Sequence, residues 1–127
     1  MFRSQMAMSI YNKITGTNDA TSAGTYTGAA DEPEGLILKD YFKTTDFFEL
    51  MEKNGMFLRN NKTKKLLPEM IDWADIVINM AEEPYIPDFL RNNKKVLWWD
   101  VENPTFATKE VSESTYSKIE GLVKTLL

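Results

Sequence analysis

Met1–Ile14 reads MFRSQMAMSIYNKI, and an arginine and a serine, Arg3 and Ser4, stand at the beginning of its helical pattern. Apolar residues follow this pair at spacings of three and four, which predicts an amphipathic helix over residues 4–14. Gly16 comes next, where a left-handed C-cap would lie. Taken alone, Arg3-Ser4 is read most simply as a solvated cation and a helix N-cap. The rest of the chain must therefore decide whether the pair belongs to a site.

Length and composition restrict the possible functions. The 127 residues are enough for one domain with a single core, and the net charge of −4 gives no reason to expect binding to nucleic acid or to an anionic membrane. We find no apolar run long enough to cross a bilayer and no signal-peptide pattern, so we expect a cytoplasmic location. The sequence contains no Cys and no His. Thiolate nucleophiles, His bases and Cys or His metal ligands are therefore excluded, and we expect no metal or cofactor.

Two compact apolar runs, IVINM (Ile76–Met80) and KVLWW (95–99), are typical of strands that are covered on both faces. Residues 20–23 form a third, weaker strand-like stretch. Besides residues 4–14, the expected helices are one capped by Thr44 or Thr45 and stopped by Gly55, a short one over Pro68–Trp73, one around 86–92, and a last one from about Val111 to Leu126. Strands that alternate with helices predict an α/β fold with a parallel sheet. Ligands bind such sheets at the carboxyl ends of the strands, so we expect the functional rim just after Met80 and just after Trp99.

Three further stretches have simple structural interpretations. Residues 22–25 (SAGT) are small, which lets the chain pass close to a neighbouring element. Residues 31–34 (DEPE) are expected to form a solvated loop. The pair Trp98-Trp99 is interpreted as core and rim packing rather than as a substrate wall.

Four motifs, taken together and in this order, resemble one family. They are RSQMA at residues 3–7, SAGT at 22–25, ADIVINM at 74–80 and WDVENP at 99–104. The chain is similar, over nearly its whole length, to the low-molecular-weight protein tyrosine phosphatases and the related thioredoxin-coupled arsenate reductases. The resemblance implies a small three-layer sandwich around a central parallel sheet, with four strands in the family, and one domain over residues 1–127.

The resemblance also implies the chemistry of the site. In the family, a Cys-x5-Arg-Ser loop leads from the first strand into the first helix and holds a phosphate, and the Cys attacks phosphorus to form a cysteinyl-phosphate. Arg3 and Ser4 match the last two residues of this loop and are the expected phosphate-binding residues. Asn103, directly before Pro104, stands where the family has its general-acid Asp, and an amide cannot donate a proton at neutral pH. Asp100 or Glu102 could replace that acid.

The position of the Cys, six residues before Arg3, falls outside the sequence. We therefore expect a chain that is truncated at its N-terminus, that lacks the first strand of the sheet and the nucleophile, and that is inactive as given. Such a chain is expected to be marginally stable or to self-associate through open sheet edges.

Three functions remain open from the sequence. The first is a low-molecular-weight phosphatase acting on a phosphorylated small molecule or a phosphotyrosine peptide, with Tyr85 or Trp99 at an aromatic rim. The second is a non-catalytic relative that binds phosphate or a phosphopeptide. The third is an arsenate reductase-like protein, which is less favoured because no cysteine follows Arg3.

Overall fold

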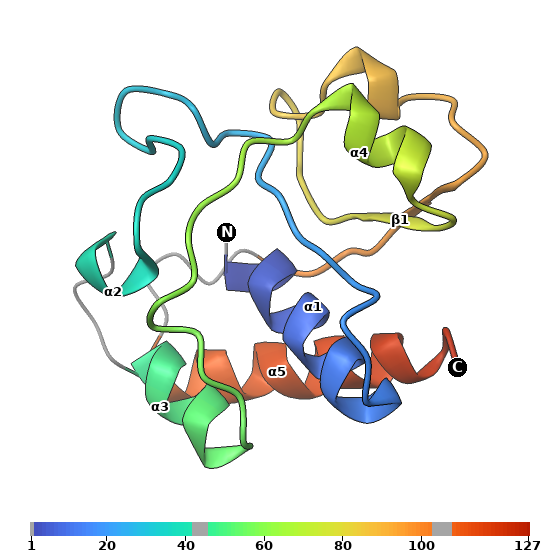
Figure 1. Cartoon of the computed structure of the whole chain (residues 1–127). Coiled ribbons are helices and arrows are strands. Elements are labelled where there is room, and N and C mark those ends of the chain that lie inside the picture. The colour runs from blue at the N-terminus through green and yellow to red at the C-terminus, as the bar shows by residue number, and fades with distance from the viewer. Residues whose placement is uncertain (1, 42–45, 103–107) are drawn as a thin grey trace.

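The computed structural model of the chain describes residues 2–41, 46–102 and 108–127 (Figure 1). Its elements are α1 (Phe2–Thr15), α2 (Leu38–Tyr41), α3 (Asp46–Lys53), α4 (Pro68–Trp73), β1 (Val77–Asn79), the 3-10 helix η1 (Asp88–Leu90), β2 (Val96–Trp98) and α5 (Lys109–Lys124). Helices α1, α3, α4 and α5 confirm predictions made from the sequence. None of the described helices is long and apolar enough to span a membrane.

The two strands form a parallel pair, in which Val77 lies opposite Val96 and Asn79 opposite Trp98. Parallel neighbours need a crossover connection, and residues 80–95 supply it, with η1 inside. In Figure 1, α4 lies on one side of β1, and α1 with α5 lies on the other. The Lys95 Nζ donates to the Ile71 and Asp72 carbonyls at the end of α4, at 3.2 and 3.3 Å, and so ties α4 to the start of β2. The α/β fold with a parallel sheet is therefore confirmed.

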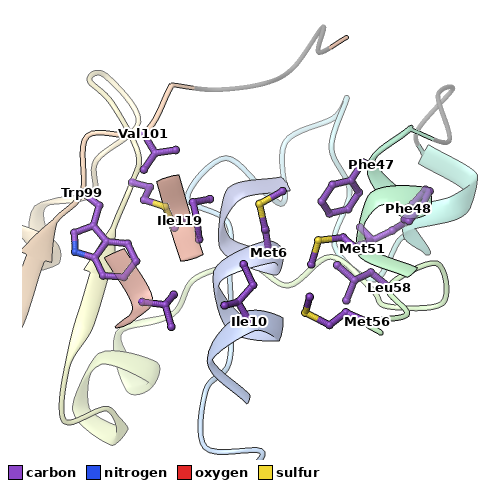
Figure 2. Close-up of a cluster of buried hydrophobic side chains, with 13 residues drawn as sticks. Met6, Ile10, Phe47, Phe48, Met51, Met56, Leu58, Trp99, Val101 and Ile119 are labelled. Atoms are coloured by element: carbon purple, nitrogen blue, oxygen red, sulfur yellow. The ribbon is translucent and has the colours of Figure 1, made fainter. Parts of the chain in front are cut away.

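The core lies mainly between α1, α3 and α5 (Figure 2). Met6 and Ile10 of α1 meet Phe48 and Met51 of α3 and Ile119 of α5, and each of these side chains is almost completely buried. The spacing of these residues in each helix is the i, i+3, i+4 pattern that places them on one face. Trp99 and Val101, which follow β2, join the same cluster and connect the sheet to the helices.

Two predicted features of the sheet region are wrong. The helix expected around residues 86–92 is only the single turn of η1, since Pro87 precedes it and Asn92 adopts a left-handed φ of 56°. The strands are not covered on both faces, because Leu97 and Trp98 of β2 are exposed. Apolar runs of this kind predict strands, but the burial of a strand depends on which elements pack on it.

Residues 20–24 form no strand, although Gly24 makes an isolated parallel bridge with Lys65. A Cβ on Gly24 would lie 2.3 Å from the Oγ1 of Thr27, so the expected close approach at residues 22–25 is present. The interpretation of residues 31–34 as solvated is wrong for Glu32. Its carboxylate is buried and accepts a hydrogen bond of 2.8 Å from the Thr27 hydroxyl.

Candidate functional site

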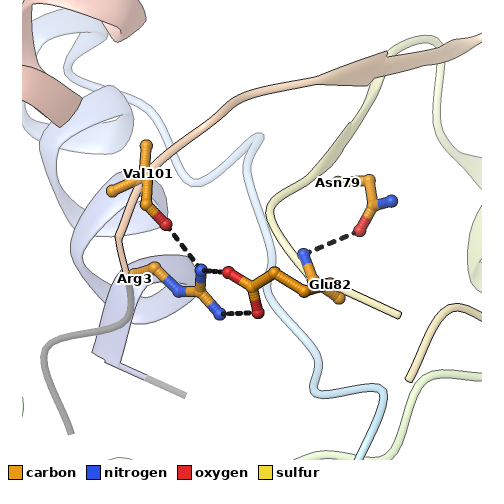
Figure 3. Close-up of polar contacts among 5 residues, drawn as sticks. Arg3, Asn79, Glu82 and Val101 are labelled. Atoms are coloured by element: carbon orange, nitrogen blue, oxygen red, sulfur yellow. Dashed lines mark hydrogen bonds and ion pairs between the residues drawn. The ribbon is translucent and has the colours of Figure 1, made fainter. Parts of the chain in front are cut away.

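The site is centred on Arg3, in the first turn of α1 (Figure 3). Its Nη1 donates to the Glu82 Oε1 at 2.6 Å and to the Val101 carbonyl at 2.6 Å, and its Nη2 donates to the Glu82 Oε2 at 3.4 Å. The Arg3 side chain is only 9% exposed. A single guanidinium therefore joins the segment after β1 to the segment after β2.

The sequence around β1 fixes the position of Glu82. Asn79 ends the strand with a buried side chain, whose Oδ1 accepts from the Ala81 N–H at 2.9 Å (Figure 3). This local side-chain to main-chain bond fixes the path of the chain directly after β1. The Asn79 carbonyl also accepts from the Trp99 N–H at 3.0 Å, which keeps the two strand ends side by side. As a result, the carboxyl ends of β1 and β2 meet at Arg3.

The local field at this point is positive apart from Glu82. The first turn of α1 carries no acidic residue, so the positive end of the helix dipole and the Arg3 guanidinium act in the same direction. The hydrogen bond from Arg3, helped by its charge, holds the pKa of Glu82 below its ordinary value against the effect of burial. The Glu82 side chain is 52% exposed. Its carboxylate thus occupies the two donor groups of the Arg3 guanidinium, which are suited to bind an oxyanion, and half of its surface is open to water.

Ser4 lies beside Arg3 in the same turn of α1, is half-buried, and lines the same cavity as Arg3. Asp100 and Glu102 are exposed, and neither lines that cavity. Asn103 lies outside the described residues. The structure therefore places the two predicted phosphate-binding residues on one cavity, whereas the two candidate acids flank Val101, which contacts Arg3, without lining that cavity.

The aromatic residues divide between core and surface. Trp99 is buried in the core cluster and lines the cavity, whereas Trp98 is exposed. Tyr85 is exposed and packs edge-on against Tyr26, with ring centroids 5.3 Å apart. The Tyr26 hydroxyl donates to the Asp31 carboxylate at 2.7 Å, and this bond raises the pKa of Tyr26 to about 12. Because the Tyr85 N–H donates to the Glu82 carbonyl, this aromatic pair lies one turn from the carboxylate that holds Arg3.

Sequence reasoning missed Glu82 and Asn79. Asn79 was visible as the single polar residue in the apolar run IVINM. Glu82 follows the strand directly on the predicted rim, where a buried arginine would need a carboxylate. Among the described residues, no group of three or more carboxylates is placed to hold a metal ion.

No protein-family model and no curated protein matches the sequence. The structure, in contrast, matches a solved one, the low molecular weight protein tyrosine phosphatase from T. tengcongensis, with a TM-score of 0.72 and 25% sequence identity. The match covers 98% of this chain and 88% of the phosphatase chain. The chain has the low-molecular-weight protein tyrosine phosphatase fold. The resemblance inferred from the four sequence motifs is confirmed.

The phosphatase fold explains why these motifs occur in their order. Arg3 and Ser4 begin α1, residues 74–80 contain β1, and residues 99–102 follow β2. In this fold Arg3 of the first motif contacts Val101 of the last motif and Glu82, which lies two residues after the third motif.

Proposed function

We propose that this chain is a low-molecular-weight phosphatase-like protein that binds a phosphorylated ligand at Arg3 and Ser4. The observation that supports this most is the arginine fork at the start of α1, between the ends of both strands, where it already holds a carboxylate. A phosphate presents the same array of acceptor oxygens with more charge. The ligand enters by displacing Glu82, whose side chain is exposed enough to leave.

The proposed ligand class is an aryl phosphate, in a small molecule or a phosphotyrosine peptide. Tyr85 and Tyr26 offer an exposed aromatic edge close to Glu82, and aromatic rings favour such offset or edge-on contacts. Arg3 would position the phosphate, and the aromatic pair would contact the ring.

We further propose that the 127 residues do not hydrolyse this ligand. Cysteinyl-phosphate chemistry needs a thiolate, and the sequence contains no Cys. Neither Asp100 nor Glu102 lines the cavity beside Arg3 as a proton donor. The same lack of cysteine argues against an arsenate reductase, since that reaction passes through a cysteine disulfide relay in the family that the chain resembles.

The test is binding of inorganic phosphate and phenyl phosphate, measured by calorimetry and by thermal stabilisation. Arg3→Met is expected to weaken binding at least about tenfold, because a charge-assisted forked contact is lost. Arg59→Met is the matched control, since Arg59 also makes a forked ion pair, with Glu52 at 2.6 and 2.9 Å, away from the cavity. Glu82→Gln is expected to tighten binding, because it removes the competing negative charge.

Equal loss of binding in the Arg3 and Arg59 variants would contradict the site. Catalysis is tested separately with para-nitrophenyl phosphate. Turnover that scales with protein concentration and is inhibited by vanadate would contradict the inactive assignment while leaving the binding site in place.

A further inference from the structure

Arg91 holds together the loop of residues 83–91, which follows β1 and contains η1. Its Nη2 pairs with the Glu83 Oε1 at 2.5 Å and donates to the Ile86 carbonyl at 3.2 Å. Its Nε lies 3.4 Å from the Asp88 Oδ1. One guanidinium therefore contacts three points of the loop, and such a network fixes the chain better than a single exposed ion pair does.

Tyr85 lies in the middle of this loop, between two prolines. Pro84 precedes it directly and Pro87 follows two residues later, and each proline restricts its own φ to about −65°. The Tyr85 N–H donates to the Glu82 carbonyl at 2.8 Å. The main chain on both sides of Tyr85 thus has few conformations open to it, so the contacts of Arg91 are enough to set the direction of the ring.

Tyr26, the ring that Tyr85 contacts, is fixed from a different loop. Its hydroxyl donates to the Asp31 carboxylate at 2.7 Å, and the hydroxyl of the next residue, Thr27, donates to buried Glu32 at 2.8 Å. The rings of Tyr26 and Tyr85 meet at an interplanar angle of 75°. The aromatic pair therefore depends on two loops, and each loop is held by side-chain contacts of its own.

The two adjacent glutamates attach the chain after β1 to two different arginines. Glu82 pairs with Arg3, whereas Glu83 pairs with Arg91. A ligand that displaces Glu82 from Arg3 removes only the first of these attachments. The contact between Glu83 and Arg91 remains, so Tyr85 keeps its place when the ligand binds.

We propose that Arg91 is a positioning residue, which holds Tyr85 against Tyr26 and thereby gives the site a preference for aryl over alkyl phosphates. This inference rests on the function proposed above, in which Arg3 binds the phosphate and the aromatic pair contacts the ring. Arg91 acts through Tyr85 and does not touch the ligand. A ring that is already fixed loses little freedom on binding, so its contact counts almost fully toward affinity.

The experiment compares phenyl phosphate with methyl phosphate by calorimetry, because the two ligands share the phosphate group and differ in the aromatic ring. The wild-type chain is expected to prefer phenyl phosphate. Arg91→Met is expected to reduce this preference about two- to tenfold, the value of one aromatic contact, through weaker binding of phenyl phosphate. Arg59→Met is the matched control, since it removes the same charge and a comparable ion pair elsewhere, and it is expected to keep the preference.

Glu83→Ala separates positioning from charge. It breaks the same ion pair as Arg91→Met but changes the net charge in the opposite direction. An effect of charge would therefore have opposite signs in the two variants, whereas a loss of positioning lowers the preference for phenyl phosphate in both. The effect of Glu83→Ala is expected to be the smaller one, because Arg91 keeps its contacts with Ile86 and Asp88.

A second readout, which needs no ligand, is the nuclear Overhauser effect between the rings of Tyr26 and Tyr85. It is expected in the wild-type chain and in Arg59→Met, and it is expected to weaken in Arg91→Met. The proposal is overturned if Arg91→Met keeps this signal, keeps the wild-type preference, or loses a preference that Glu83→Ala raises. If neither phosphate ester binds the wild-type chain, the proposed function fails, and the ring signal still decides whether Arg91 positions Tyr85.

Discussion

The helical region and the sheet region of this molecule differ in how well they are buried. In the helical region, Met6, Phe48, Met51 and Ile119 are at most 1% exposed. In the sheet region, four large apolar side chains are between 44% and 64% exposed: Trp73, Ile76, Leu97 and Trp98. Both regions are built from apolar sequence, yet only one of them forms a closed core.

The difference shows what each kind of element needs for burial. An amphipathic helix buries the apolar side chains on its one face as soon as another helix packs against that face. Helices α1, α3 and α5 each contribute such a face. A strand needs neighbours at both edges and layers on both faces, and the described part of β1 pairs only with β2. We infer that most of the stability lies in the helical region, and that the sheet region is held by Trp99, Val101 and the contacts of Arg3.

The largest expected effect tests this inference directly. Ile119→Ala, at a fully buried position of α5, is expected to lower the free energy of unfolding by about 2–5 kcal/mol, because it leaves a cavity in the core. Leu97→Ala, on exposed β2, is expected to change it by no more than about 0.5 kcal/mol. Urea unfolding followed by circular dichroism measures both. Similar losses in the two variants would show that the sheet region is as well packed as the helical one.

Substitutions at two glycines, Gly24 and Gly121, test the comparison with changes in stability of intermediate size. Gly24→Ala is expected to destabilise the protein by about 1–3 kcal/mol, since its Cβ would displace a Thr27 hydroxyl that is fixed by buried Glu32. Gly121→Ala is the matched control. Nothing lies within 4 Å of its Cβ in α5, so it is expected to stabilise the helix by about 0.5–1 kcal/mol. Thermal unfolding measures both effects. An unchanged melting temperature of the Gly24→Ala variant would mean that Thr27 moves aside at little cost.

The sequence predicted the helical region better than the sheet region for the same physical reason. Local periodicity reflects which face of α1, α3 or α5 is buried, so these helices could be located from the sequence alone. The strands were also located, at Ile76–Met80 and 95–99, but their exposure was not. Leu97 and Trp98 are exposed because no distant segment among the described residues covers them. The residues close to them in the sequence do not reveal whether such a segment exists.

The candidate site was predicted in part. Arg3, Ser4 and the ends of the strands were identified from motifs and from the rule for parallel sheets. Glu82 was missed because two glutamates, Glu82 and Glu83, follow the strand, and only the folded chain shows that Glu82 is the one that pairs with Arg3. The role of Asn103 as the residue at the acid position stays a prediction, since it lies outside the described residues.

The smallest expected effect concerns the ion pair that joins the two regions. Arg3 keeps the pKa of Glu82 below its ordinary value of 4.5, so the pair stabilises the fold fully above pH 4.5. This contribution is lost as the pH falls through the lowered pKa, when the carboxyl becomes protonated. The Glu82 side chain is 52% exposed, and solvent screening limits the effect to about 1 kcal/mol or less.

Glu82→Gln should therefore lower the free energy of unfolding at pH 7, and this loss should shrink as the pH falls through the lowered pKa of Glu82, as measured by urea unfolding over a series of pH values. Glu52→Gln is the control, because the pKa of Glu52 is also lowered, by Arg59, but this pair lies within the helical region. Only the Glu82 variant is expected to speed amide exchange at Ala81 and Trp99, since only that pair holds the strand ends against α1. If both variants speed exchange there equally, the two regions unfold as one unit. The helical region would then not be more stable than the sheet region, despite its better burial.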